Sequence, residues 1–492
     1  MDGVFLLKKL VPLAALMAGI GLLTTGCQTY QQKNKTLLYW RQGEVARAEA
    51  EATKVADANA NGKDAVIYRL EQGATLRALG KYRESNNAFN LAQDKMADYE
   101  QKAKVSISRE TGALLSNQAN LPYEGRSYDG IMLNTYEALN YLALGEPDKA
   151  RPELIRAYQR QQDAVDENQK RIQRAQDEAA QTKDHALFEK AEQDPRFKAE
   201  VQNSLSDINN LNGYADYVNP FTVYLDGLYF MAYATDYSDL ERARKSFERV
   251  ASFTGNDEYV RQDLAQVNAL INGQPLTPTT YVIFETGCAP IREQSRIDIP
   301  ILVYRVSYVG ATFPILVPQG DYYPELTVVA NGTRYQTKTV ANMDGVIALD
   351  FKNEMPVVIL KTIAATVTKA TASYFANAAV GQKDETAGFL MQLLTAGYQM
   401  AVNIADTRTW TTLPKKFQVC RFPTPPDGKV ELLAPSGTKV VVSLVGAGGA
   451  KNDLTSTNGV QTSLNAVSGL NVVYVKSIAA GTPLLVSQFK LR

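Results

Sequence analysis

The pattern of apolar residues changes its period near residue 275, and this change limits the folds open to the chain. Between about residues 33 and 272, apolar residues recur every three or four positions, which is typical of amphipathic helices. Beyond residues 274–278, Val, Ile, Thr and Tyr alternate with polar residues in runs of five to eight, which indicates strands. The sequence therefore predicts an α+β protein with a helical domain over 28–275 and a β-rich domain over 276–492.

The helical half contains windows that are similar to tetratricopeptide repeats. In the clearest window, Gly73 would lie where two helices cross, Gly80 would end the first helix with positive φ, and Phe89 would fill the space between neighbouring helices. Further, more degenerate copies lie at 33–55, 130–158 and 225–251. We expect a tetratricopeptide-like array, and the alternative is an irregular helical bundle with the same small-residue packing.

Two segments depart from these patterns. Residues 159–206 are rich in charged and amide side chains with a sparse apolar seam, so we expect a charged helical arm that projects from the array, either solvated or used for docking. Within the β half, the pattern returns to helical near 353–405, and residues 386–405 carry no charge. We expect an inserted helical hairpin there, packed against a β-sandwich-like domain; contact with a membrane or a second copy is the alternative.

Short turn signals support the β assignment. Asn331 and Gly332 separate two predicted strands and are a strong signal for a two-residue hairpin turn. Further strands are predicted at 281–285, 301–308, 416–422, 429–433, 439–445, 460–466, 471–476 and 484–490.

Composition excludes several classes of function. The 52 basic and 52 acidic residues balance, so no global charge points to nucleic acid. His185 is the only histidine of the chain, which removes Ser-His-Asp triads and histidine-rich metal sites. No phosphate loop or dinucleotide fingerprint occurs, and we expect no catalytic residue, no cofactor and no metal. The loops 123–126 and 285–293 could hold an acid–base site, but salt-bridged turns are commoner.

The N-terminus predicts the cellular compartment. Lys8 and Lys9 precede an uncharged run from residue 10 to 23, which ends just before Cys27. This arrangement resembles a bacterial lipoprotein signal, in which cleavage leaves the cysteine as the first residue, with diacylglycerol on its thiol and a third acyl chain on its amine. Residues 1–27 are therefore predicted to be signal peptide and lipidated cysteine, and Gln28 after it implies sorting to the outer membrane. A secreted protein without lipid is the alternative.

The other two cysteines and a set of aromatic residues are the remaining candidates. Cys288 and Cys420 would lie in an oxidising compartment and could form a disulfide; the alternative is two buried thiols. Aromatic residues crowd the helical half, where they usually form core but could line a groove for a partner. The candidates for partner binding are Tyr82, Tyr128, Tyr141, Tyr217, Phe221 and Tyr224.

Several motifs together resemble one family of proteins. They are the Cys27 signal, the stretch 140–145 within 128–150, Asn219–Pro220–Phe221, residues 284–287, and the loop 406–414, in which Asp406 and Arg408 are expected to pair and Trp410 to pack as a plug. The chain is similar to bacterial outer-membrane lipoproteins that combine tetratricopeptide-like helices with a β-rich C-terminal half. The resemblance implies no activity.

These observations predict a lipid-anchored envelope protein that acts as an interaction scaffold or assembly factor and binds another envelope protein. It would be held by its N-terminal lipid at the outer membrane, facing the periplasm or the cell surface. One alternative is a carboxylate-based glycan or peptidoglycan hydrolase, and another is a carrier of lipid or small molecules. The sequence does not indicate an oligomeric state.

Overall fold

The computed structural model describes residues 34–105, 118–180, 193–204, 206, 214, 217–255, 257–299, 309–381, 405–444 and 469–492. The helices are α3 (Lys35–Arg41), α4 (Val45–Ala58), α5 (Ala65–Ala78), α6 (Tyr82–Val105), α8 (Ser127–Ala143), α9 (Pro147–Ala180), α11 (Pro195–Ser204), α13 (Pro220–Ala232), α14 (Tyr237–Phe253), α15 (Glu258–Ile271) and α16 (Met343–Gly381), with a short 3₁₀ turn, η1 (Gln118–Asn120). The strands are β1 (Thr279–Thr286), β2 (Ile291–Ile299), β3 (Val309–Val317), β4 (Thr327–Ala330), β5 (Thr333–Gln336), β6 (Lys338–Asn342), β7 (Lys416–Pro423), β8 (Lys429–Leu433), β9 (Lys439–Ser443), β10 (Leu470–Ser477) and β11 (Leu485–Leu491). The protein is thus α+β, as the sequence predicts.

The helices before residue 275 pack mainly as sequence neighbours: α3 with α4, α5 with α6, α8 with α9, and α13 with α14. Glycine permits the closest of these contacts, since a Cβ on Gly73 would lie 2.3 Å from Cε1 of Phe89. Gly80 ends the α5 segment at φ 71°, and its N–H donates to the carbonyl of Arg77. Both glycines therefore have the roles that the sequence predicts for them.

Two sheets hold most of the strands. The five-stranded sheet has the order β11-β10-β1-β7-β6, in which β1 and β10 are parallel and the other pairs antiparallel. The four-stranded sheet has the order β5-β4-β8-β9. Its β4–β5 turn is the predicted hairpin, with Asn331 at φ 49° and Gly332 at φ 74°.

The five-stranded sheet is the middle layer of the molecule. Side chains alternate between the two faces of a strand, and in β1 Tyr281 and Ile283 join the core shared with the helices. Val282 and Phe284 point the other way and pack against residues of the four-stranded sheet, such as Val328. Because both faces are covered, every residue of β1 and β10 is buried.

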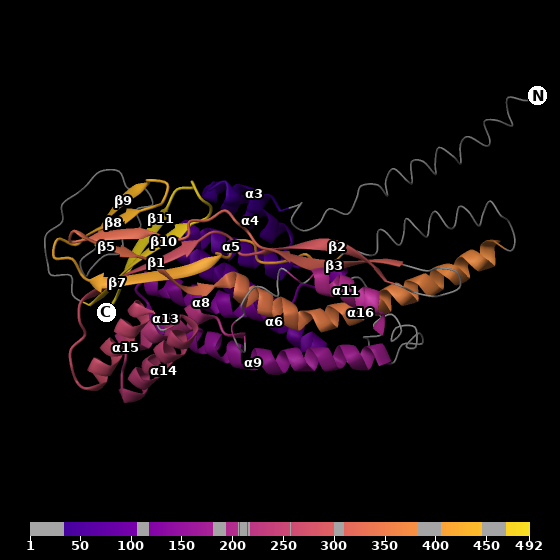
Figure 1. Cartoon of the computed structure of the whole chain (residues 1–492), viewed down its shortest axis with the longest axis horizontal. Coiled ribbons are helices and arrows are strands. Elements are labelled where there is room, and N and C mark those ends of the chain that lie inside the picture. The colour runs from indigo at the N-terminus through magenta and orange to yellow at the C-terminus, as the bar shows by residue number, and fades with distance from the viewer. Residues whose placement is uncertain are drawn as a thin grey trace, which may run out of the picture.

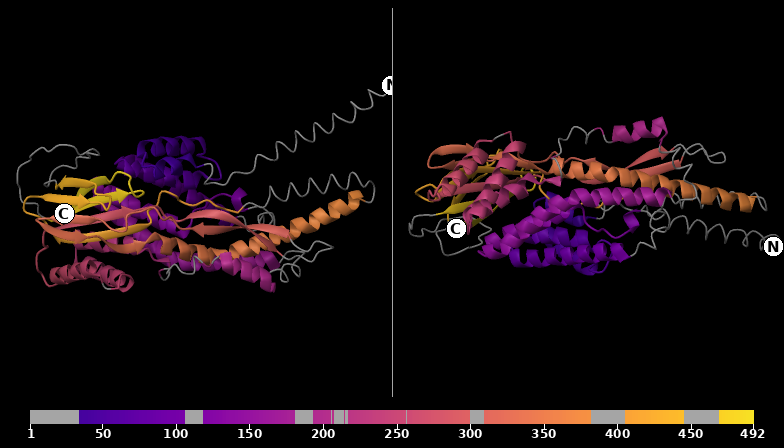
Figure 2. Two further views of the ribbon diagram at one scale, coloured as in Figure 1. Left: turned by 45° about the horizontal axis from the view of Figure 1, so that its top comes forward. Right: turned by 90° about the horizontal axis from the view of Figure 1, so that it is seen from below.

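A long limb extends from one end of these layers (Figures 1 and 2). It consists of α16, the two-stranded β2–β3 hairpin, α11, and the part of α9 beyond Gln161, and we call this set of segments the limb. Within it α16 packs on α9 and β3, and α11 packs on β2. The limb is therefore built from parts of the chain that are far apart in sequence.

The limb corrects two expectations from sequence. The charged segment 159–206 does not stand alone, because Ala175 on α9 is buried in the shared core and Phe197 on α11 contacts Phe313 of β3, with ring centroids 5.9 Å apart. A sparse apolar seam is sufficient here, since the β-rich half supplies the facing surface. The predicted helix near 353 begins earlier, at Met343, and Pro356 lies inside it.

Several expectations fall outside the described residues. These are the signal peptide with Cys27, His185, the predicted strands at 301–308 and 460–466, and the second helix of the inserted hairpin except for Ala405. Among the residues that are described, no helix combines the length and apolar character needed to cross a membrane.

Candidate functional site

The inner side of the helical pairs is occupied by the β-rich half of the same chain. Helix α8 lies at the centre, and all of residues 131–140 are buried. Phe221 of α13 stacks on Phe417 of β7, with ring centroids 3.9 Å apart and planes 6° apart. Tyr128 and Thr409 share a hydrogen bond of 3.0 Å between their hydroxyl oxygens. Helices α8 and α13 therefore pack against the β-rich half of the same chain.

The aromatic residues predicted from the sequence to bind a partner lie mostly in this packed interior. Tyr82, Tyr128, Tyr217, Phe221 and Tyr224 are all buried, which fits the core interpretation rather than an exposed groove. Tyr224 donates to Asp263, which also accepts from Tyr281 of β1. Tyr141 is the exception among the six, because it is only partly buried and lies under the ammonium of Lys149.

Trp410 is the centre of the contact between the two halves. Its ring is fully buried against Phe89 of α6 and Tyr136 of α8, with centroids 5.8 and 5.9 Å away. The indole N–H donates to the hydroxyl of Thr412 at 2.9 Å, so its polar atom is satisfied. Trp410 is thus a packed plug, as the loop sequence suggests.

The loop that carries Trp410 is held by a second set of polar contacts. Arg408 makes a two-point ion pair with Asp406, with both N–O distances 2.8 Å, and reaches Asp64 before α5 at 2.8 Å. The carboxylate of Glu71 on α5 accepts hydrogen bonds from the backbone N–H and the hydroxyl of Thr411 at 2.7 and 2.6 Å. The expected Asp406–Arg408 pair is therefore present and forms part of a larger network.

A buried ion network fixes the limb to the body, and we call it the limb root. Glu354 of α16 pairs with Arg126, just before α8, and with Arg292 of β2 at 2.8 Å. Arg126 also lies 3.9 Å from Asp406 of the Trp410 loop. Arg126 and Arg292 are buried, and Glu354 is nearly so. Four separate segments of the chain therefore meet at this network.

The electrostatics of the limb root follow from this geometry. Burial alone would raise the pKa of Glu354, but the adjacent Arg126 and Arg292 guanidiniums hold it far below its usual range. Burial, together with the charge of Glu354, raises the pKa of the neighbouring Asp350. Breaking one partner of such a buried pair leaves an uncompensated charge and typically costs about 3–5 kcal/mol.

Sequence reasoning found the residues of the limb root only in part. The 123–126 loop is a salt-bridged turn through Arg126, and Glu285 of the other candidate loop pairs with Lys476 at 2.5 Å. Arg292 and Glu354 carry no motif. Arg292 falls within the predicted loop 285–293 and Glu354 within the predicted helical insertion near 353–405, but no sequence pattern connects the two.

The two cysteines correct the disulfide expectation, since both are free thiols. Cys420 lies between the two sheets, whereas Cys288 lies beneath α3 in a separate cluster with Trp40 and Ile478. Burial raises the pKa of the Cys288 thiol to about 11 and raises that of Cys420 further. Two buried thiols in different layers match the alternative reading of these residues.

A pair of acids on α8 and α9 was not recognised from the sequence. Burial and the adjacent Glu153 carboxylate raise the pKa of Glu137 to about 9, and Asn134 donates to both at 3.3 and 2.8 Å. Glycosidases use two carboxyls about 5–9.5 Å apart on either side of a bound sugar, whereas Glu137 and Glu153 both contact the same side-chain amide. The two residues are 1% and 7% exposed, so the pair contributes to the helix interface and offers no surface to a glycan.

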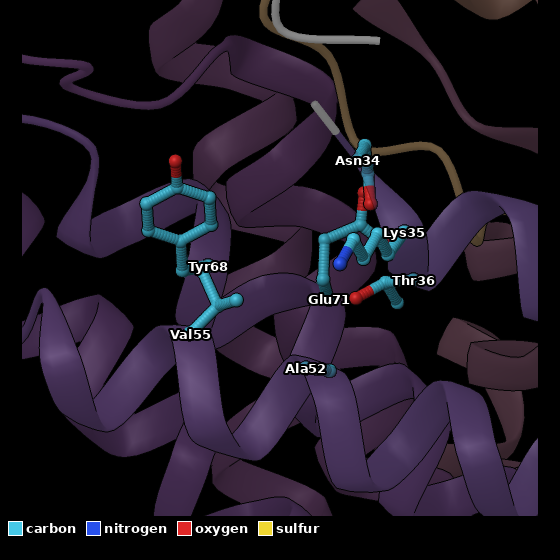
Figure 3. A pocket seen from close by; sticks show the side chains of 7 residues that line it. All are labelled: Asn34, Lys35, Thr36, Ala52, Val55, Tyr68 and Glu71. Atoms are coloured by element: carbon cyan, nitrogen blue, oxygen red, sulfur yellow. The ribbon is translucent and has the colours of Figure 1, made fainter. Parts of the chain in front are cut away.

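A small pocket lies where the helical half begins. Asn34, Lys35 and Thr36 at the start of α3, with Ala52, Val55, Tyr68 and Glu71 of α4 and α5, surround a cavity of about 50 Å³ (Figure 3). This volume has room for about three or four water molecules, and metabolite sites span roughly 300–1,000 Å³. Within the described ranges, no cluster of three or more His, Cys, Asp or Glu side chains could hold a metal ion.

The fold defines the protein by its architecture: paired helices cover one face of a five-stranded sheet, a four-stranded sheet covers the other face, and a limb extends from one end (Figure 1). Comparisons of the chain with protein-family models, with curated proteins and with solved structures found no match. The resemblance to outer-membrane lipoproteins therefore rests on the sequence motifs alone.

Proposed function

We propose that the protein is a lipid-anchored interaction scaffold of the bacterial envelope, tethered through Cys27 to the outer membrane and presenting its limb to another envelope protein. The helical half is a tetratricopeptide-like array, and the two facing sheets form a β-sandwich-like domain. The protein acts by holding a partner, without a cofactor or catalytic residue.

The observation that carries this proposal is the limb with its charged root. At about 1.5 Å per residue, the 39 residues of α16 extend roughly 58 Å. The ion network of Glu354, Arg126 and Arg292 fixes this length to the body. A rigid surface loses little conformational entropy on binding, which favours association.

The other surfaces of the helical half also favour the limb as the partner-binding surface. Because the inner side of the helical pairs is filled by β7 and the Trp410 loop, a partner would have to displace the β-rich half to bind there. The outer face of α9 in the limb is exposed and polar, with both signs of charge, for example at Lys170, Arg174 and Asp177. Such a face suits a polar partner surface rather than an apolar helix.

The other two functions have less support from the described residues. The Glu137–Glu153 pair is buried in a helix interface, which disfavours a hydrolase. The pocket beside Glu71 is too small for a lipid, and residues 382–404, which belong to the helices that would form a carrier's cavity, lie outside the described residues.

Site-specific photo-cross-linking in intact envelopes tests the proposal. A photo-reactive residue is placed at Gln173 of α9 or Gln294 of β2, both exposed on the limb, with Lys245 of α14 and Asp427 as exposed controls on the body. We expect a discrete cross-linked partner from the two limb positions and none from the controls. The same labelled chain with Cys27→Ala should move to the soluble fraction and lose the cross-link.

Two outcomes would contradict the proposal. Equal cross-linking from Lys245 and the limb positions would place the partner on the body. Cross-links to lipid and abundant porins alone, from every position, would remove the scaffold function.

A further inference from the structure

The pocket beside α3 contains a buried carboxylate oxygen with no hydrogen-bond partner among the described residues. Glu71 is 2% exposed, and its Oε1 accepts both hydrogen bonds from Thr411. Its Oε2 is buried and forms no hydrogen bond among the described residues, although the N–H and hydroxyl of Thr412 lie close enough to the carboxylate to lower its pKa. The Glu71 side chain lines the cavity beside Asn34 and Lys35 (Figure 3). A buried, unpaired oxygen next to a water-sized cavity indicates that a proton or another small positively charged species belongs there.

Glu71 is connected to the docking of α3. The hydroxyl of Thr411, which donates to Glu71, also accepts a weaker hydrogen bond of 3.4 Å from the side-chain amide of Asn34. Asn34 in turn caps α3 by accepting from the N–H of Leu37 at 3.0 Å. One contact chain therefore links α5, the Trp410 loop and the first described helix.

Helix α3 covers residues that would be exposed if it moved away. Trp40 on α3 is fully buried and packs with Cys288 and Ile478. Its ring also lies under the ammonium of Lys476, with 5.0 Å between the nitrogen and the ring centroid. The accessibility of the Cys288 thiol therefore reports whether α3 is docked.

We propose that Glu71 and its pocket form a proton-binding site that controls the docking of α3: the neutral carboxyl keeps α3 docked, and the ionised carboxylate releases it. The inference does not depend on the proposed scaffold function. On ionisation the proton leaves Oε2 for water in the pocket, and a negative charge then remains in a buried position.

The groups around Glu71 do not compensate that charge. Lys35 of α3 is exposed, and the salt bridges of the described residues include none between it and Glu71. Tyr68, on the same helix as Glu71, lies toward Asp64 and Arg408. The charges of Lys476, Arg41 and Glu71 all act on the buried Cys288 thiol, and Lys476 is paired with Glu285. Helix α4 contributes only Ala52 and Val55 to the pocket.

The pH range of the proposed switch follows from this burial. Burial raises the pKa of Glu71 to about 7, against the opposing effect of the N–H and hydroxyl groups of Thr411 and Thr412. The docked state thus binds a proton more tightly than an open state, whose carboxyl would have the usual value of 4.5. Docking is then fully favoured below about pH 4.5, and it weakens as the pH rises toward 7 and above.

Thiol labelling of the full chain tests the inference, with each cysteine followed by peptide mass spectrometry. The labelling rate of Cys288 is measured from pH 5 to 8.5 in the wild type and in Glu71→Gln, which imitates the neutral carboxyl. Taking the ratio of the wild-type rate to the variant rate at each pH removes the pH dependence of the thiol's own reactivity. We expect this ratio to rise by roughly tenfold or more across the range.

Cys420 is the internal control, because it lies between the sheets and away from α3. Its wild-type to variant ratio should stay constant. A Cys288 ratio that also stays constant would overturn the inference.

A second measurement removes the dependence on a variant that could fail to fold. Hydrogen exchange of α3 in the wild type, corrected for its intrinsic pH dependence, should lose protection between pH 5.5 and 8, while α14 should not. Unchanged protection of α3 would overturn the inference. If potassium but not choline suppresses the opening of α3 at pH 8, the pocket is a binding site for a small cation. That result would also overturn the inference.

Discussion

The packing around Trp410, which we call the groove contact, and the ion network of the limb root join the same two halves of the chain. The first does so by apolar burial and the second by buried ion pairs. At the groove, Trp410, Phe89 and Tyr136 are fully buried, and the indole N–H is satisfied. At the limb root, Arg126, Arg292 and Glu354 are almost as deeply buried but carry charge. The first contact gains stability from apolar area, whereas the second mainly fixes geometry, because the cost of desolvating the ions offsets much of their attraction.

The difference shows what each contact does for the molecule. Apolar packing closes the helical array on its own β-rich half and accounts for global stability. The charged network joins α16, β2 and the Trp410 loop through ion pairs that would be broken if one of these segments moved. The two regions should therefore respond differently to substitution and to pH.

Removing the plug should have the largest effect. Trp410→Ala deletes a fully buried aromatic ring and should lower the free energy of unfolding by about 3–5 kcal/mol, measured by denaturant titration. Trp410→Phe is the matched control and should lose about 1 kcal/mol, since it keeps most of the packing and loses the indole hydrogen bond. A loss below about 1 kcal/mol for the alanine variant would show that the groove is not closed by this loop.

Neutralising the limb root should have a smaller and more local effect. Glu354→Gln leaves two arginines without their shared carboxylate and should cost about 2–4 kcal/mol, somewhat below the range for fully buried pairs because Glu354 is 14% exposed. Hydrogen exchange should show the loss in α16 and β2–β3 more than in α8. Equal loss throughout would contradict the separate role of the root.

The pKa of Glu354 also predicts how the stability of the protein changes with pH. The pKa of Glu354 is depressed in the folded state, so its stabilisation is present above the unfolded value of 4.5 and is lost as the pH falls below it. Wild-type stability should therefore converge toward that of Glu354→Gln on acidification. Glu71 shifts in the opposite direction, and its contribution is lost as the pH rises.

The helices, strands and turns could be predicted from the sequence more completely than the contacts between them. The change from helix to strand, the roles of Gly73, Gly80 and Phe89, and the Asn331–Gly332 turn all follow from local chemistry, and the structure has them. Both strands of the β2–β3 hairpin were missed. Arg292, Glu293 and Arg296 interrupt the apolar alternation of β2, and the strand predicted at 301–308 lies outside the described residues.

The contacts between halves were beyond sequence reasoning for a physical reason. The aromatic side chains of Tyr128, Phe221 and Tyr224 are equally suited to a partner's surface and to the protein's own sheet, and only the fold decides between them. The ion network has no spacing in sequence, since Arg126, Arg292 and Glu354 meet across more than 200 residues. The unpaired oxygen of Glu71 likewise depends on where Thr411 lies.

A double-mutant cycle between Phe221 and Phe417 tests most directly whether the helical array encloses its own β-rich half. Phe221→Leu, Phe417→Leu and the double variant are compared by denaturant unfolding. The stacked rings, 3.9 Å apart at their centroids, should give a coupling energy of about 0.5–1.5 kcal/mol. A coupling of zero within error would mean that the rings do not meet in solution and would contradict the closed groove.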